Sequence, residues 1–238
     1  MNRFYIEKLV VSGGGHKTTV IDFKPGLNFI LGPSNTGKSL IMDCIDYVFG
    51  FTPRKNRPSK IVDNNYGYEC IALHLITGKG TVILERKIGD SKITVSGTAP
   101  DVDHGSYNVS HNAKKNINAV YLHLLGIDEQ HLVRSAEKGS KTQELTWRSM
   151  LHLFFIRQGD VARESSSLLS PGSIGSTASA AVLLYLLTGQ DANNLEATED
   201  PKISEAKKKA LVGYIQERIN SLCDRREKLE NMLSSANV

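Results

Sequence analysis

The sequence lacks the features that mark membrane, exported and metal-binding proteins. Its apolar runs stay well short of the roughly eighteen residues that cross a bilayer. Glu7 stands where the apolar part of an export signal would lie. The three cysteines, Cys44, Cys70 and Cys223, are far apart and show no metal-ligand spacing, which is typical of a reducing compartment. We therefore expect a cytoplasmic protein with no membrane partner.

The chain does have enough apolar residues for a core, and a modest positive charge. Of its 238 residues, 40% are hydrophobic and 23% are charged, which supports one large domain or two small ones and excludes wholesale disorder. The net charge of +4 permits an acidic partner such as nucleic acid without requiring one. Composition thus limits the class of protein but leaves its chemistry to the motifs.

Hydrophobic periodicity and turn residues predict both strands and helices. Strands are expected over residues 4–6, 9–11, 18–23, 27–31, 69–76, 81–88 and 92–95. Helices are expected over residues 40–49, 117–125 and 143–155, and after residue 201. Residues 97–112 are interpreted as a loop, and Arg86 as an exposed strand residue.

One segment carries a phosphate-binding motif. The Walker A pattern G-x-x-x-x-G-K-S is matched by Gly32-Pro33-Ser34-Asn35-Thr36-Gly37-Lys38-Ser39, between an expected strand and an expected helix. Its glycines let the backbone turn its N–H groups toward phosphates. Lys38 supplies a cation toward the β- and γ-phosphates, and Ser39 offers a hydroxyl to Mg²⁺. We expect this motif and the following Leu40 to bind ATP, with Lys38 also acting in catalysis.

The residues around the motif resemble a known family. Residues 23–39 are similar to the first nucleotide-binding segment of SMC and RecN-type ATPases, which are ABC-type heads carried on long coiled coils. A second match, Phe154-Phe155-Ile156-Arg157-Gln158-Gly159-Asp160-Val161, resembles the Q-loop of those ATPases. The resemblance implies that Gln158 reaches Mg²⁺ and the attacking water, a task that suits an amide because its oxygen ligates without competing as a base. The implied metal ligands are Ser39 and Gln158.

The final helix resembles the coiled-coil arm that follows the Q-loop in that family. Its apolar positions lie alternately three and four residues apart, with one polar interruption: Val212, Ile215, Ile219, Leu222, Arg226, Leu229 and Leu233. An amphipathic helix on a globular core is the alternative. The resemblance implies an α/β P-loop NTPase of ABC/SMC type, with a mixed sheet and surrounding helices. We expect an N-terminal lobe of the ATPase head over residues 1–200 and the start of a coiled-coil arm over residues 201–238.

Residues 145–195 show a narrower resemblance, to SMC-like ATPases of anti-phage defence, the Lamassu type. It is carried by Leu145-Thr146-Trp147-Arg148 and by Thr188-Gly189-Gln190-Asp191. The partners implied by the two resemblances are the C-terminal lobe of the same head, a second copy of the head joined through ATP, DNA, and an effector nuclease subunit.

Two other interpretations stay open. In a stand-alone NTPase, residues 124–129 would form a Walker B motif in which Asp128 holds Mg²⁺ and Glu129 polarises the attacking water. The apolar residues before Asp128 have helical spacing, which argues against the strand that a Walker B motif needs. A non-catalytic, nucleotide-gated DNA scaffold would instead use a basic cluster that a solvated loop explains equally well: Arg54, Lys55, Arg57 and Lys60.

The sequence contains no acceptable ABC signature, Walker B pair or switch histidine after Gln158. The resemblance therefore covers only half of a working head. We expect this chain to bind ATP and, by itself, to hydrolyse it weakly or not at all.

Overall fold

The computed structural model describes residues 4–15, 17–53, 61, 67–136, 141–157, 161, 166, 168, 175–193 and 201–236. Its strands are β1 (Phe4–Ser12), β2 (Thr19–Asp22), β3 (Cys70–Thr77), β4 (Gly80–Lys87), β5 (Lys92–Gly97), β6 (Gly105–Asn108), β7 (Leu132–Arg134) and β8 (Thr142–Glu144). Its helices are α1 (Lys38–Val48), α2 (Asn118–Leu124), α3 (Trp147–Met150), α5 (Ser176–Thr188) and α6 (Pro201–Ala236), and the 3₁₀ turn η3 spans Leu151–Leu153.

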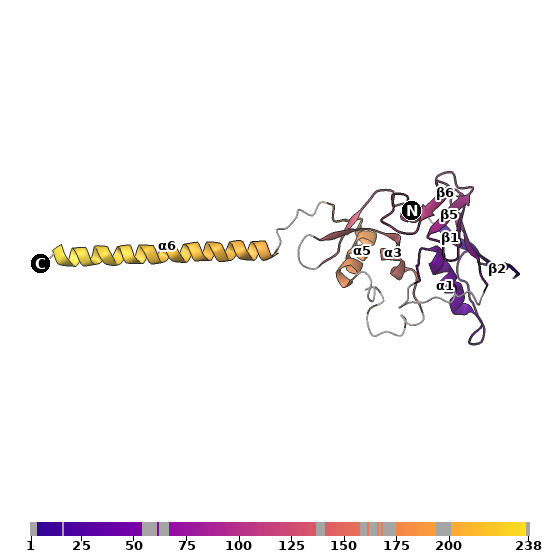
Figure 1. Ribbon diagram of the computed structural model, residues 1–238, viewed down its shortest axis with the longest axis horizontal. Helices are drawn as coiled ribbons and strands as arrows, with labels where there is room; N and C mark the ends of the chain where they lie inside the picture. The colour runs from indigo at the N-terminus through magenta and orange to yellow at the C-terminus, as the bar shows by residue number, and fades with distance from the viewer. Residues whose placement is uncertain are drawn as a thin grey trace.

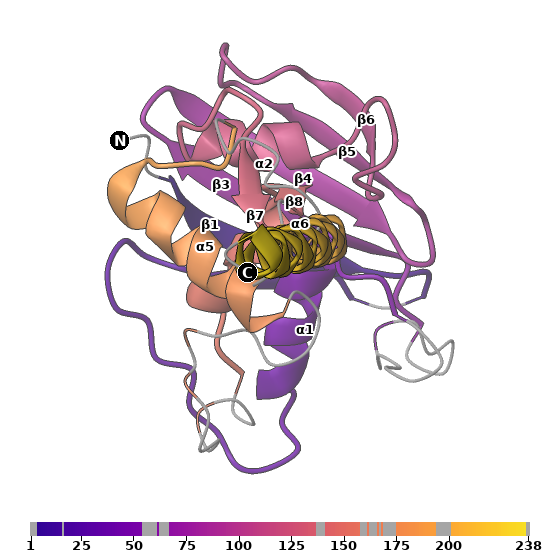
Figure 2. The same cartoon turned by 90° about the vertical axis from the view of Figure 1, so that its left-hand side faces the viewer.

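Six strands form one sheet in the order β2-β1-β3-β4-β5-β6, while β7 and β8 form a separate pair. Buried and exposed side chains alternate along β4 and β5, so one face of the sheet carries the core. In Figure 2, α1, α2 and α5 lie in front of this sheet, and α1 packs against β3 and β4. The α/β class is confirmed. The named strands pair only antiparallel, so the described residues do not show the mixed sheet that was expected.

Helix α1 is exposed at its start and buried at its end. Ser39 is exposed, whereas residues 44–49 are buried in the core between the sheet and the other helices. The Tyr121 hydroxyl of α2 donates a hydrogen bond to the Val48 carbonyl at 2.6 Å. The last turn of α1 is therefore fixed in the core, and its first turn lies at the surface.

Arg86 of β4 is buried, contrary to the exposed position that was expected for it. Its side chain is 2% exposed and lies 3.9 Å from the centroid of the Tyr47 ring. The guanidinium donates to the carbonyls of Tyr47 (2.7 Å), Phe51 (2.8 Å) and Asp90 (3.0 and 3.1 Å). Burial is the main cause that lowers the pKa of Arg86 below its ordinary value. The alternation of β4 places Arg86 on the same face as Val82 and Leu84, but it does not show the carbonyls of other segments that make the burial of a charge possible.

Residues 27–31 do not form the expected strand in the part of the chain that the structure describes. The Asn28 side chain instead closes a turn: it accepts from the Lys24 N–H at 2.9 Å and donates to the Lys24 carbonyl at 2.7 Å. Leu27, Phe29 and Leu31 are 80%, 76% and 87% exposed. A strand needs a hydrogen-bonding neighbour, and β1 is already paired on both edges, by β2 and β3.

Two further expectations are wrong in detail. Residues 143–155 are not one helix, because β8 ends at Glu144 and Thr146 is extended (φ −125°, ψ 154°). Thr146 then caps α3 in a reciprocal pair of hydrogen bonds with Ser149, and η3 follows. Residues 97–112 contain β6, which has little apolar character but pairs with β5. The helices expected near residues 40–49 and 117–125, and the hairpin of β3 and β4, are confirmed.

Helix α6 extends away from the rest of the molecule in Figure 1 and has 36 residues. Side chains between residues 205 and 228 are exposed, including the predicted seam positions Val212, Ile215, Ile219 and Leu222. An exposed apolar seam is what a coiled-coil partner requires. The arm itself stays a prediction, as does the division near residue 200. Among the described residues, no helix is long and apolar enough to cross a membrane.

Replacing Arg86 by alanine is expected to lower the free energy of unfolding by about 3–5 kcal/mol, because buried carbonyls lose their charged donor. Urea unfolding followed by circular dichroism measures the change. Lys87→Ala removes an exposed cation from the next position of β4 and serves as the matched control. Equal stability of the two variants would contradict the anchoring role of Arg86.

Candidate phosphate-binding site

The phosphate loop curls directly into α1, as the Walker A pattern predicts. Asn35 (φ 62°) and Gly37 (φ 85°) lie in the left-handed region, and Gly37 is the N-cap of the helix. Glycine reaches this conformation without strain, while asparagine is among the few other residues that enter it. The loop is closed further at Gly32, where a Cβ atom would lie only 2.9 Å from the Thr36 hydroxyl.

The Lys38 ammonium lies inside this loop and is held by it. It donates to the carbonyl oxygens of Gly32, at 2.7 Å, and Pro33, and lies 3.4 Å from the Thr36 hydroxyl oxygen. Thr36 itself donates to the Pro33 carbonyl at 2.8 Å. A cation on the long lysine side chain is therefore presented within a ring of backbone groups, where an incoming phosphate oxygen is able to pair with it.

The donors present suit a nucleotide phosphate with Mg²⁺. Gly37 caps α1 without any side-chain oxygen, so the first N–H groups of this 11-residue helix have no capping side chain. These N–H groups and the Lys38 cation favour an anion, while the exposed Ser39 hydroxyl follows at once in the chain. Gly32 to Leu40, the residues predicted to bind ATP, thus lie together at the start of α1. Gln158, the other predicted magnesium ligand, lies outside the described residues, as does the basic cluster of residues 54–60.

The segment that precedes Gln158 is attached to α1 by an ion pair that the sequence reasoning missed. Arg157 donates to Asp43 at 2.8 Å and to Asp46 at 2.7 Å. These carboxylates outweigh the opposing effect of burial and raise the pKa of Arg157. Phe154 and Ile156 are exposed, whereas Phe155 and Arg157 are partly buried, so one side of this segment is covered.

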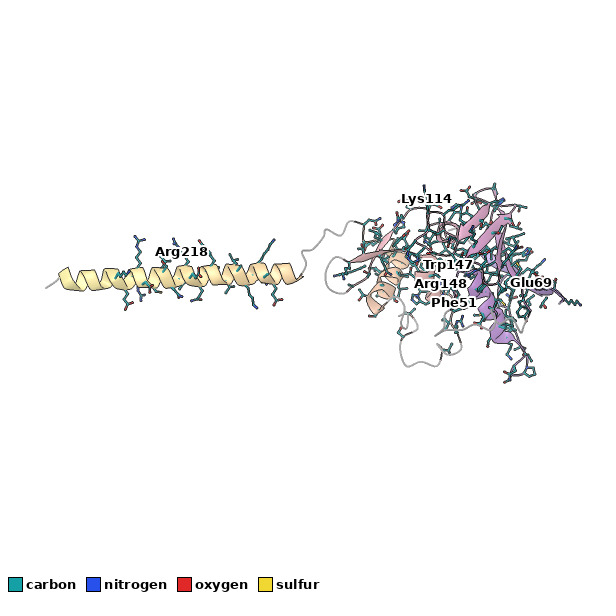
Figure 3. The ribbon with its side chains drawn as sticks, viewed as in Figure 1. Phe51, Glu69, Lys114, Trp147, Arg148 and Arg218 are labelled. Atoms are coloured by element: carbon teal, nitrogen blue, oxygen red, sulfur yellow. The ribbon has the colours of Figure 1, made fainter. Side chains whose placement is uncertain are left out.

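A second arginine completes this cluster from α3. Arg148 donates to the other oxygen of Asp46, a carboxylate whose side chain is only 3% exposed. Figure 3 shows Arg148 beside Trp147 and near Phe51, at the level of the buried end of α1. Asp46 thus receives two guanidinium groups, which offsets the cost of burying its charge. In the sequence, the position of Asp46 between apolar residues of an expected helix was the feature that could have indicated a buried carboxylate.

Asp128, the candidate Walker B carboxylate, does not follow a strand. It comes after α2 and Gly126 (φ 79°), which is a typical helix end. Its carboxylate contacts His123 Nδ1, and His123 Nε2 lies 3.3 Å from Asp101. The hydrogen bond to Asp128 is the largest effect on the pKa of His123, which is raised above its ordinary value. This arrangement explains Asp128 as a partner of His123 and gives the stand-alone NTPase no support; Glu129 is exposed.

Comparison with protein families adds a decisive match. A family model described as an AAA domain matches residues 14–236, from the loop after β1 to the end of α6. The chain belongs to this family. This AAA domain is accordingly a nucleotide-binding domain of the P-loop ATPase kind, and the match supports the expected ATPase head of SMC-like type. AAA domains use a nucleotide and usually Mg²⁺. A search of curated proteins finds none that matches the chain.

Lys38→Ala is expected to weaken ATP binding by about 10- to 100-fold, because a charge-assisted hydrogen bond contributes about 1.5–3 kcal/mol. Isothermal titration calorimetry with ATP and Mg²⁺ measures the change. Lys92→Ala removes an equal charge from the exposed first position of β5 and controls for net charge. Unchanged affinity in the Lys38 variant would show that the nucleotide binds elsewhere.

Protonated His123 is expected to stabilise the fold at low pH. Its folded-state pKa is raised, so this contribution is complete below about pH 6.5 and is lost as the pH rises through the folded value. Urea unfolding at about pH 6 and about pH 8 is expected to show a smaller loss of stability in His123→Gln than in the wild type. If both proteins lose the same stability between these pH values, His123 does not contribute.

Proposed function

We propose that this chain is the ATP-binding N-terminal lobe of an SMC-like ATPase that acts on DNA. The observation that carries the proposal is the phosphate loop at the start of α1, with Lys38 held inside it and Ser39 exposed beside it. The family match supports ATP as the nucleotide. Lys38 would face the β- and γ-phosphates, and Ser39 together with Gln158 would hold Mg²⁺.

Hydrolysis, in this proposal, requires a C-terminal lobe. The apolar side chains of Leu27, Phe29 and Leu31 before the phosphate loop are exposed, and so are Phe154 and Ile156 before Gln158. A patch of this kind at a binding site is typical of a surface that another segment covers. We propose that strands of the C-terminal lobe cover residues 27–31 and complete the sheet there. That lobe would also supply the carboxylates that polarise the attacking water.

Two such heads would then close over two nucleotides, and opening would follow hydrolysis. Helix α6, with its exposed apolar seam, would begin the coiled-coil arm that joins the two lobes. DNA would be the substrate to be sensed, tethered or processed. The residues 54–60 offer cations for phosphate contacts, and such binding falls steeply with salt.

The narrower resemblance over residues 145–195 extends the proposal to anti-phage defence, with an effector nuclease as partner. Trp147 and Arg148 of that stretch are packed around the end of α1, and Thr188 and Gly189 end α5. These are structural positions, so the resemblance is expected to reflect a shared head and not a shared substrate site. A gene neighbourhood containing only housekeeping repair genes would count against a defence role.

The chain alone is expected to bind ATP with weak or undetectable turnover, because its sequence contains no acceptable Walker B pair or signature after Gln158. Release of inorganic phosphate from ATP and Mg²⁺, with Lys38→Ala as the background, is the measurement. Robust turnover that Lys38→Ala abolishes would overturn the need for a second lobe. In that event, trapping of ATP by Glu129→Gln would restore the stand-alone NTPase.

A further inference from the structure

The contact between Arg157 and α1 joins two parts of the proposed site. One part is the helix that begins with Lys38 and Ser39. The other is the segment 154–157, whose next residue is Gln158. Arg157 binds two carboxylates of α1 at once, Asp43 at 2.8 Å and Asp46 at 2.7 Å. These two contacts fix the orientation of the Arg157 guanidinium relative to α1 as well as its distance from the helix.

The positions of these carboxylates along α1 place the Arg157 contact on the same helix face as Ser39. Asp43 is four residues after Ser39, and Asp46 is seven residues after it. Residues at these spacings lie on the same face of an α-helix, so Ser39, Asp43 and Asp46 form one stripe. From Ser39 to Asp43 the helix rises by about 6 Å. Arg157 is therefore seated one helical turn below the hydroxyl that is expected to ligate Mg²⁺.

We propose that Arg157 is a positioning residue which holds the chain before Gln158 on the face of α1 headed by Ser39 and thereby couples Mg²⁺ to nucleotide binding. Gln158 follows Arg157 directly in the sequence, so an attachment of Arg157 to this stripe acts on the residue next to it in the chain. The inference rests on the proposed function, because it assigns Arg157 a part in the same site. In this proposal Arg157 acts on Mg²⁺ only through the segment that it attaches to α1.

Arginine is the residue that this attachment requires. Its planar guanidinium offers two parallel N–H donors to two acceptors, whereas a lysine ammonium is a point charge. The Asp46 side chain is 3% exposed and also receives Arg148, which comes from α3 and does not adjoin Gln158. Arg148 therefore provides a matched control: it shares a carboxylate with Arg157 but holds a different segment.

The test compares binding of a fluorescent ATP analogue with Mg²⁺ and with EDTA, in the 238-residue chain. The ratio of the two affinities is the magnesium coupling. Loss of an outer-shell partner typically costs about 10- to 100-fold in metal affinity, so Arg157→Gln is expected to reduce the coupling by about 10-fold. The affinity in EDTA is expected to stay unchanged, and Arg148→Gln is expected to keep the full coupling.

Asp43→Asn keeps the proposal testable if Arg157→Gln does not fold, since Asp43 is partly exposed and its loss leaves the buried Asp46 paired. It is expected to reduce the coupling in the same direction, and Arg157→Lys to restore part of it. Unchanged coupling in these variants would overturn the proposal. So would an equal loss of affinity with and without Mg²⁺, which is the sign of a purely structural role.

Failure of the proposed function would give a different result in the same binding assay. In that case the wild-type chain binds no ATP analogue, or Lys38→Ala binds it as well as the wild type does. Either result overturns the nucleotide site and the role of Arg157 together. A wild type that binds through Lys38 but gains no affinity from Mg²⁺ overturns only the role of Arg157.

Discussion

A buried guanidinium at the C-terminal end of α1 is the interaction on which the position of the phosphate loop depends. Arg86 donates to carbonyls at the end of this helix, where the helix dipole places its partial negative charge. The Tyr121 hydroxyl adds a further donor to the same end. A charge that is 2% exposed is tolerable only because these acceptors satisfy it. The cost of burying it makes the geometry specific, since few other arrangements would satisfy the same donors.

Helix α1 then carries three kinds of chemistry along its length. Its first turn presents the phosphate loop, Asp43 in its middle and Asp46 in its last turn pair with arginines from other segments, and that last turn is held in the core. Because one rigid helix joins the three, the spacing between anchor, ion pairs and loop is set by the helical rise. The apolar side chains of residues 27–31, before the loop, and those of Phe154 and Ile156 stay exposed.

The sequence allowed the phosphate loop, its helix and the β3–β4 hairpin to be predicted, because each has a local signal in residue type and period. Arg86, Asp46, Arg148 and Arg157 could not be assigned in the same way, since their partners lie far along the chain and no period in the sequence records such pairings. The strand expected over residues 27–31 failed for a related reason. Apolar residues indicate that a segment seeks cover, but a strand forms only beside a partner.

Trp147 gives the molecule an optical property. It is the single tryptophan of the chain. Its ring lies 5.1 Å from that of Phe49, just past the end of α1, and 5.5 Å from that of Tyr121. Its indole nitrogen is buried and has no hydrogen-bond partner among the described residues. A shift of α1 against its anchor would change the surroundings of this one indole, so a tryptophan of α3, packed at the end of α1 opposite the phosphate loop, would report movement of that helix by fluorescence.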